Sequence, residues 1–266
     1  ADIFEAFMRF ETLDFCARLQ VRATRLGDLT VLTDDKIAKV HKKIPVIDTF
    51  HHSEYSTREK ELRRDIADIV HRAYKQLLMT STEGTVSARL DERSFLITPY
   101  GYDRKLLEPA DVVMVRDGRA EAGRPASRSA RLHQAMYAAH PDLNAVIVAH
   151  PPAMMAFAVT HQPFDSRVIP ESYILLRDIE QLPYGVSYTD YPTVVQAISP
   201  ATPNVILQNE ALIVTGDSLL HAFDRLEVAE YTAESILTAK TLGPVVAIGD
   251  KDIRELDRAF NLPDRQ

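Results

Sequence analysis

Apolar and polar residues alternate along the chain with two periods, one typical of helices and one typical of strands. Residues 57–79 have the helical period, with Ser56 or Thr57 as the expected N-cap and Glu59 in the first turn. Further helices are expected over 129–139 and from about residue 217. Short runs with strand alternation occupy 85–90, 94–98, 111–115, 145–149, 205–207 and 212–215. These elements predict an α/β fold whose helices cover a central sheet, largely antiparallel because several connections have hairpin length.

The two ends of the chain resemble each other. When Ala6 is aligned with Ala222 without gaps, ten of the 32 positions in 6–37 and 222–253 are identical, whereas ordinary composition gives roughly two. Each copy predicts a long amphipathic helix that ends at a glycine, then a short extended stretch and a final helix with an acidic start. Two Ala-rich amphipathic helices can be alike by accident, but the identities continue beyond the helix, through Leu26-Gly27 and Asp34.

The likeness predicts how the chain is organised. Residues 1–50 are expected to be the C-terminal helix and tail of a preceding unit, and residues 53–258 a complete domain with its own C-terminal helix. The offset between the copies, 216 residues, is a plausible length for one domain.

Composition and charge narrow the class of protein. Hydrophobic residues make up 45% and charged residues 26%, as in ordinary globular proteins. The sequence contains neither an apolar run long enough to span a membrane nor the pattern of a signal peptide. The single cysteine, Cys16, fits a reducing compartment, and the net charge of −7 argues against nucleic-acid binding. We therefore expect a cytoplasmic protein with no membrane or nucleic-acid partner.

An ordered set of short motifs spans most of the domain. The chain resembles the class II aldolase and adducin head family, which includes fuculose-phosphate aldolase and ribulose-phosphate 4-epimerase. The resemblance implies a three-layer α/β/α fold. The motifs are Gly84-Thr85-Val86-Ser87, Phe95 to Gly101, Leu107 to Val113, Arg124 to Ser127, Leu132-His133 with Tyr137, Pro141 to Val146, Ala149 to Pro152, Ala156 to Val159, and Asn209 to Gly216.

The resemblance also implies a metal site, because the family uses a divalent metal, usually zinc, held by three histidines. At the matching positions Val148 replaces one ligand, His150 remains, and Glu210 replaces the third. Anchored on His133, the family's acid/base glutamate falls on Ser129, or on Arg128 if the turn is one residue longer. We expect no cofactor, with zinc or another divalent cation bound only if His150 and Glu210 retain the site. Otherwise His150 is a hydrogen-bonded histidine near the sheet edge and Glu210 a turn residue.

A phosphate pocket is the second site that the resemblance implies. Its matching residues are Thr85, Thr98, Gly101, Ser127 and Arg128, and Tyr100 is expected to narrow it. A guanidinium beside a helix N-terminus suits a small anion or a sugar phosphate. The alternative for Arg128 is a solvated or interface arginine.

Three functions follow from these expectations. The first is a non-catalytic structural or regulatory half of a tandem class II aldolase-family protein, with an altered metal site. The second is a metal-dependent aldehyde-lyase, epimerase or decarboxylase acting on a small sugar phosphate, with a site rebuilt around His150, Glu210 and His133 or Tyr137. The third is an adducin-head-like interaction module. The expected partner is either a homo-oligomer or a preceding or neighbouring aldolase-like domain, since the resemblance implies packing in rings.

Two groups outside these motifs are expected to lack a function. The adjacent pair His51-His52 is interpreted as part of a linker. The arginines and lysine of 58–64 alternate with acidic residues, which predicts a solvated face of salt bridges.

Overall fold

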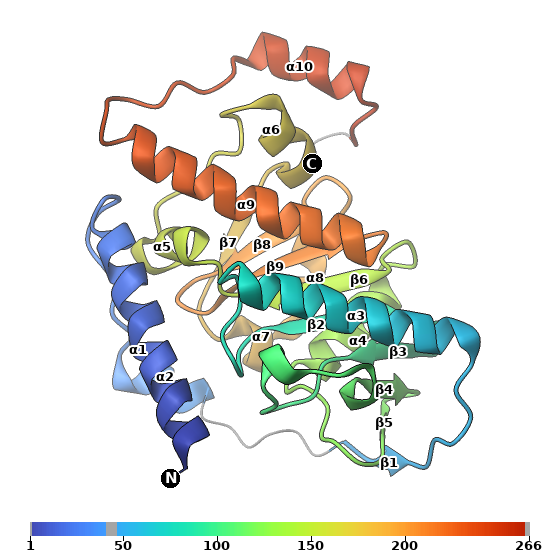
Figure 1. The fold of residues 1–266 in the computed structure, drawn as a ribbon. Coiled ribbons are helices and arrows are strands. Elements are labelled where there is room, and N and C mark those ends of the chain that lie inside the picture. The colour runs from blue at the N-terminus through green and yellow to red at the C-terminus, as the bar shows by residue number, and fades with distance from the viewer. Residues whose placement is uncertain (1, 41–46, 264–266) are drawn as a thin grey trace.

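The computed structural model describes residues 2–40 and 47–263, and a nine-stranded mixed sheet lies at its centre (Figure 1). Its strand order is β1-β5-β4-β3-β2-β6-β9-β8-β7, and only the two outermost pairs, β1–β5 and β7–β8, are parallel. The predicted largely antiparallel sheet is therefore confirmed. The strands are β1 Thr49–Phe50, β2 Thr85–Arg89, β3 Ser94–Ile97, β4 Val113–Arg116, β5 Arg119–Glu121, β6 Ala145–Ala149, β7 Glu180–Leu182, β8 Asn204–Leu207 and β9 Ala211–Gly216.

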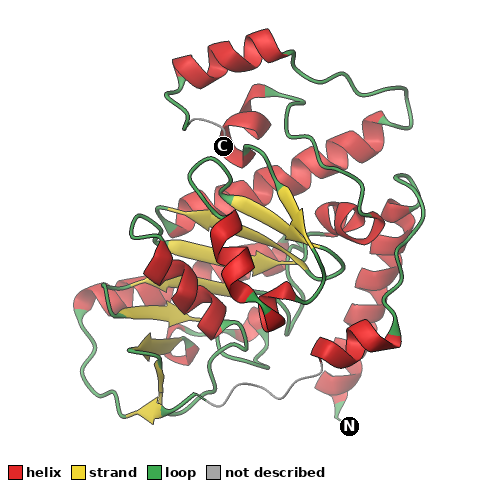
Figure 2. Cartoon of the chain, turned by 180° about the vertical axis from the view of Figure 1, so that it is seen from behind, coloured by secondary structure: helices red, strands yellow, loops and turns green. Residues whose placement is uncertain are grey.

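Helices cover both faces of this sheet and complete three layers. The long helices α3 and α9 lie over one face together with α5, and α4, α7 and α8 lie over the other, which faces the viewer in Figure 2. Helix α1 packs outside this layer, against α5. The helices are α1 Ile3–Ala23, α2 Asp34–Val40, α3 Thr57–Lys75, α4 Ala130–Ala139, α5 Pro152–Thr160, α6 Pro170–Leu176, α7 Val186–Thr189, α8 Tyr191–Ala197, α9 Leu219–Ala239 and α10 Asp250–Ala259.

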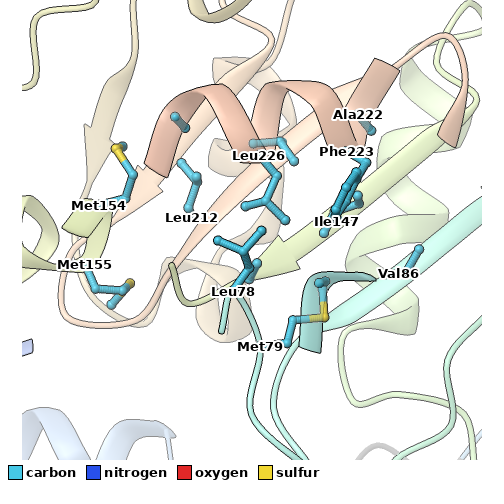
Figure 3. Close-up of a cluster of buried hydrophobic side chains, with 14 of the residues drawn as sticks. Leu78, Met79, Val86, Ile147, Met154, Met155, Leu212, Ala222, Phe223 and Leu226 are labelled. Atoms are coloured by element: carbon cyan, nitrogen blue, oxygen red, sulfur yellow. The ribbon is translucent and has the colours of Figure 1, made fainter. Parts of the chain in front are cut away.

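The hydrophobic core is divided by the sheet because neighbouring residues of a strand point to opposite faces. In β6, Ile147 packs with α3, α5 and α9, whereas Val146 packs with α4 and α8. Figure 3 shows the first cluster, in which Phe223 and Leu226 of α9 lie over Ile147. Ser56 and Ser218 fix the starts of α3 and α9, since each hydroxyl accepts a hydrogen bond from the backbone N–H three residues on.

Two predictions about local structure are wrong. Residues 111–115 are not one strand, because Pro109–Asp111 form a 3₁₀ turn in which the Asp111 carboxylate accepts from the Glu108 N–H, and β4 starts at Val113. The face of α3 is not solvated throughout. Arg63 is buried, and it donates to Glu59 at 2.8 Å, to Glu121 at 2.6 Å and to the Val112 carbonyl.

The loop that follows β1 is also more ordered than a linker. Nε2 of His52 lies 3.0 Å from both carboxylate oxygens of Glu59, and so joins this loop to the buried ion pair of α3. His51 is exposed.

The two similar ends of the sequence have matching local structures. Helices α1 and α9 are each 21 residues long. Each is followed by a glycine, Gly27 with φ 153° and Gly243 with φ 159°, whose N–H bonds the carbonyl four residues earlier. The final helices α2 and α10 start at Asp34 and Asp250, again at corresponding positions. The likeness therefore extends beyond the helices to the turns that end them.

The described helices include none that combines the length and the apolar character needed to cross a membrane.

Candidate functional site

A small pocket of about 70 Å³ lies where the start of β2 meets the ends of β3 and β6 and the start of α4. Because the strands pair antiparallel, the start of β2 and the ends of β3 and β6 lie side by side at one end of the strands. The β8–β9 turn lies at the same end. The pocket brings together six residues singled out from the sequence: Thr85, Ser127, Arg128, Ser129, His150 and Glu210. Val148, at the replaced ligand position, lines it as well.

Hydroxyl groups form a row along one wall. Oγ1 of Thr85 lies 2.8 Å from Oγ of Ser127, which in turn lies 3.1 Å from Oγ of Ser129. Ser129 occupies the N-cap position of α4, but its side chain makes no capping hydrogen bond. These hydroxyls satisfy one another and can turn toward an anion, because a hydroxyl both donates and accepts.

Two residues of the predicted phosphate pocket, Thr98 and Gly101, do not line it. Thr98 is fully buried, and its hydroxyl accepts from the Val86 N–H at 3.3 Å. The carbonyl of Thr98 accepts from the Ser127 N–H and so positions the row of hydroxyls. Gly101 is in the turn after β3 with φ 64°, a conformation that glycine adopts readily, and it does not line the pocket.

Arg128 is half-exposed at the mouth of the pocket. Its guanidinium lies 3.8 Å from the Glu83 carboxylate and 5.3 Å above the centre of the Tyr100 ring. Tyr100 lines the pocket, and Glu83 would compete with an anion for Arg128. Glu83 directly precedes the motif that begins at Gly84, and no local pattern in the sequence distinguishes it.

His150 follows β6, with its ring at the base of the pocket. Its Nδ1 atom is buried and has no hydrogen-bond partner within 2–40 and 47–263. Burial lowers the pKa of His150, against the opposing effect of the Glu83 carboxylate, so the neutral ring is favoured. The expected hydrogen bonding of His150 is therefore found only in part: a hydrogen bond with the Glu210 backbone raises its pKa, whereas Nδ1 has no partner among the described residues.

Glu210 lies in the β8–β9 turn, as expected, but its carboxylate is already engaged. It accepts a hydrogen bond from the Ser187 hydroxyl and another, at 3.2 Å, from the Gly185 N–H. Burial raises the pKa of Glu210, and these two donors oppose that effect. Desolvation also raises the pKa of nearby Tyr188 to about 12, although the residue as a whole is 41% exposed. The sequence offers no local signal for Ser187 and Tyr188, since the short helix α7 reaches the pocket only through the fold.

The residues present do not fit the metal that the family typically uses. Val148 offers no ligand atom, and the Glu210 carboxylate is committed to Ser187 and Gly185. Within the described parts of the chain, no group of three histidine, cysteine or acidic side chains is close enough to hold an ion. His150 and Glu210 both line the pocket, but they do not form a complete ligand set.

His133 and Tyr137 are the other candidates for a rebuilt site. Both lie on the buried face of α4, in the core of the domain rather than in the pocket. Nδ1 of His133 is 2.6 Å from Oγ of Ser87, which is 2.7 Å from the Tyr137 hydroxyl. Burial lowers the pKa of His133 to about 3, so the ring is neutral. Through Ser87 the pair joins α4 to β2, and neither residue lines the pocket.

Comparison with known proteins agrees with the fold. The profile of the family described as Class II Aldolase and Adducin N-terminal domain matches residues 64–237. The chain is 28% identical over 213 residues to 3-oxo-tetronate 4-phosphate decarboxylase of Cupriavidus necator, covering 76% of this chain and 97% of that protein. It is 27% identical over 203 residues to L-fuculose phosphate aldolase of Escherichia coli, covering 73% and 91% respectively.

The fold is also similar to solved structures. The crystal structure of YgbL from Klebsiella pneumoniae superposes with a TM-score of 0.68 at 22% identity, covering 76% of this chain and 100% of that one.

Proposed function

We propose a non-catalytic role for this chain, which belongs to the class II aldolase and adducin N-terminal domain family. Its relatives are enzymes of sugar phosphates. In this proposal the domain keeps their fold and a small polar pocket but does not perform metal-dependent carbon–carbon chemistry. It acts as the structural or regulatory half of a tandem protein, with a preceding aldolase-like domain as its partner.

One observation supports this proposal above the others: the family's metal-ligand positions are occupied by the side chain of Val148 and by a carboxylate that Ser187 and Gly185 already hold. A family enzyme needs free donors that converge on an ion. The hydroxyl of Ser129 also has no acid/base pKa near neutrality, so it cannot replace a glutamate in proton transfer.

The size of the pocket supports the same proposal. Its volume of about 70 Å³ is far below the roughly 300 Å³ or more of ordinary small-molecule sites. It accommodates a small anion beside Arg128 and the hydroxyls of Thr85 and Ser127. Binding of a whole sugar phosphate requires Tyr100 or Tyr188 to move away.

Metal analysis tests the proposal directly. The chain is purified without chelator, dialysed against trace zinc, and compared with the His150→Ala variant. We expect no difference in zinc content, because His150 alone does not hold the ion. The Val148→His variant is the matched control, since Val148 and His150 point to the same side of β6 and a second histidine there should increase the bound zinc. Near-stoichiometric zinc that is lost in His150→Ala contradicts the proposal.

The second candidate is a working lyase or decarboxylase on a small sugar phosphate. The unpartnered, buried Nδ1 of His150 favours it, because a neutral imidazole with a free nitrogen is the commonest metal ligand. Turnover of L-fuculose 1-phosphate or 3-oxo-tetronate 4-phosphate that requires His150 would establish this candidate.

The third candidate, an interaction module without any ligand, is separated from the first by anion binding. In the first, inorganic phosphate raises the melting temperature, and the Arg128→Ala variant loses this effect. In the third, phosphate shifts neither protein.

A further inference from the structure

Helix α1 presents an exposed apolar stripe, and the sequence likeness with α9 identifies what this stripe is built to cover. At an offset of 216 residues, Phe10 corresponds to Leu226 and Leu13 to Ala229. Phe10 and Leu13 are 68% and 66% exposed, whereas Leu226 and Ala229 are completely buried. The stripe is defined as Ile3, Phe7, Phe10, Leu13, Ala17 and Val21. Each of these residues is exposed, and each corresponds to a core residue of α9.

The acidic residue on this face shows the same difference between the two helices: it is buried in α9 and exposed in α1. In α9, Glu230 accepts from the N–H groups of Ala153 and Met154 at the start of α5. Its counterpart Asp14 is exposed on α1 and pairs with Arg18, one turn away. The whole face of α1 that corresponds to the core face of α9 is therefore solvated, including its carboxylate.

The opposite side of α1 is the one that packs on this domain. Phe15, Leu19 and Leu26 contact the core cluster around α5. In α9 the counterpart of Phe15 is Tyr231, which is 61% exposed, and the counterpart of Leu26 is Leu242, which is exposed too. The two helices therefore turn non-corresponding faces toward the core, although both pack against α5 (Figure 1).

We propose that the stripe of α1 is the docking surface for a second aldolase-like core, contributed by a preceding unit of the same protein, which α1 covers as α9 covers the core of this domain. A second copy of this chain fits the stripe poorly, because its own α9 already fills the corresponding groove. The proposal rests on the tandem part of the proposed function and is independent of its metal part. It assigns α1 to two domains at once, with one face to each.

The only cysteine of the chain reports on this surface. Cys16 lies on α1 and is exposed, and its counterpart in α9 is Thr232, which is buried and bonded to Ser172. A maleimide reagent should therefore label Cys16 rapidly in the 266-residue chain. When an aldolase-like core covers the stripe, labelling should become about a hundredfold slower, since it then requires local opening.

The test is a fusion protein in which a second core precedes residues 3–266 of the chain. A second copy of residues 49–218 is placed directly before residue 3, so that α1 follows it in the register of α9. We expect circular dichroism that reports a second folded core, together with protection of Cys16. The matched control is the same fusion carrying Phe7→Glu and Leu13→Glu, in which Cys16 should stay reactive.

Three outcomes overturn the proposal. The first is a Cys16 that reacts equally fast in the chain and in a folded fusion. The second is an added core that stays unfolded, because the proposal requires α1 to complete it. The third is protection of Cys16 in the 266-residue chain that increases with protein concentration, which assigns the stripe to self-association. The zinc content of the chain does not depend on whether α1 docks on a second core. Zinc analysis can therefore contradict the non-catalytic role while the docking proposal stands, and the labelling experiment can do the reverse.

Discussion

The carboxylate of Glu230 joins two helices of the core. It projects from α9 and accepts hydrogen bonds of 2.9 Å and 3.1 Å from the N–H groups of Ala153 and Met154, which are otherwise unsatisfied in the first turn of α5. The helix dipole and these donors favour the charged form, but burial outweighs them and raises the pKa of Glu230 from 4.5 to about 7.

This shift predicts a pH dependence of stability. Between pH 4.5 and about 7 the folded state keeps a proton on Glu230 that the unfolded state has released, so the free energy of unfolding should fall as the pH rises. The loss attributable to Glu230 is on the order of 3 kcal/mol. Urea unfolding at pH 5 and pH 8 measures it.

The Glu230→Gln variant isolates the contribution, because its amide oxygen still accepts from α5 but does not titrate. We expect its stability difference between the two pH values to shrink. The Glu255→Gln variant, on α10 and largely exposed, should behave like the wild type. A Glu230→Gln variant with the full wild-type pH dependence would contradict the assignment.

At the scale of elements, the junction between β9 and α9 depends on a glycine. A Cβ atom on Gly216 would lie 2.6 Å from the Ala222 nitrogen and 2.8 Å from the Ser218 carbonyl oxygen. Both atoms belong to the backbone of the first turn of α9, so they cannot rotate away. The strand can therefore lead into the helix only through a residue without a side chain.

We expect Gly216→Ala to lower the free energy of unfolding by about 1–3 kcal/mol, as overpacking does elsewhere. Chemical denaturation measures the effect. Gly249→Ala before α10 is the control, because its backbone has φ −69° and its new Cβ would meet only Asp252, at 3.9 Å. Equal stabilities of the two variants would show that α9 can shift to make room.

Most elements could be predicted from local patterns because their residues face one core. The β-branched run at 145–149 forms a strand, and Ser56 does cap α3. Residues whose roles depend on distant partners could not be predicted. Arg63 looks like a surface arginine until α3 packs beside β5, where it finds Glu121.

In the site, too, some residues could be predicted from sequence and others depend on partners that are distant along the chain. The family resemblance implies a metal position for His150 and Glu210 and a separate phosphate pocket for Arg128, whereas the structure brings all three residues to one pocket. The engagement of Glu210 by Ser187 could not be predicted, since Ser187 is 23 residues away in sequence and α7 has no recognisable motif. Nor does any local pattern separate Thr98, which lies behind the pocket wall, from Thr85, which forms it.

At the scale of the whole molecule, truncating corresponding side chains of α1 and α9 should change the free energy of unfolding by very different amounts. Phe10→Ala removes an exposed ring and should change the free energy of unfolding by no more than about 0.5 kcal/mol. Leu226→Ala, at the corresponding position of α9, leaves a cavity in the core and should cost about 2–5 kcal/mol. Urea unfolding of the two variants measures both. Similar costs would mean that the stripe of α1 already has a partner.

The strand order has a consequence for biosynthesis. β6 pairs with β2 on one side and with β9 on the other, and β9 is the last strand along the chain. While the ribosome is still extending the chain, β6 has one unpaired edge and its apolar face is bare until residues 211–216 and then α9 emerge. An exposed strand edge beside bare apolar surface is prone to aggregation and attracts chaperones. The nascent chain is therefore most vulnerable late in translation, after most of its strands have already been made.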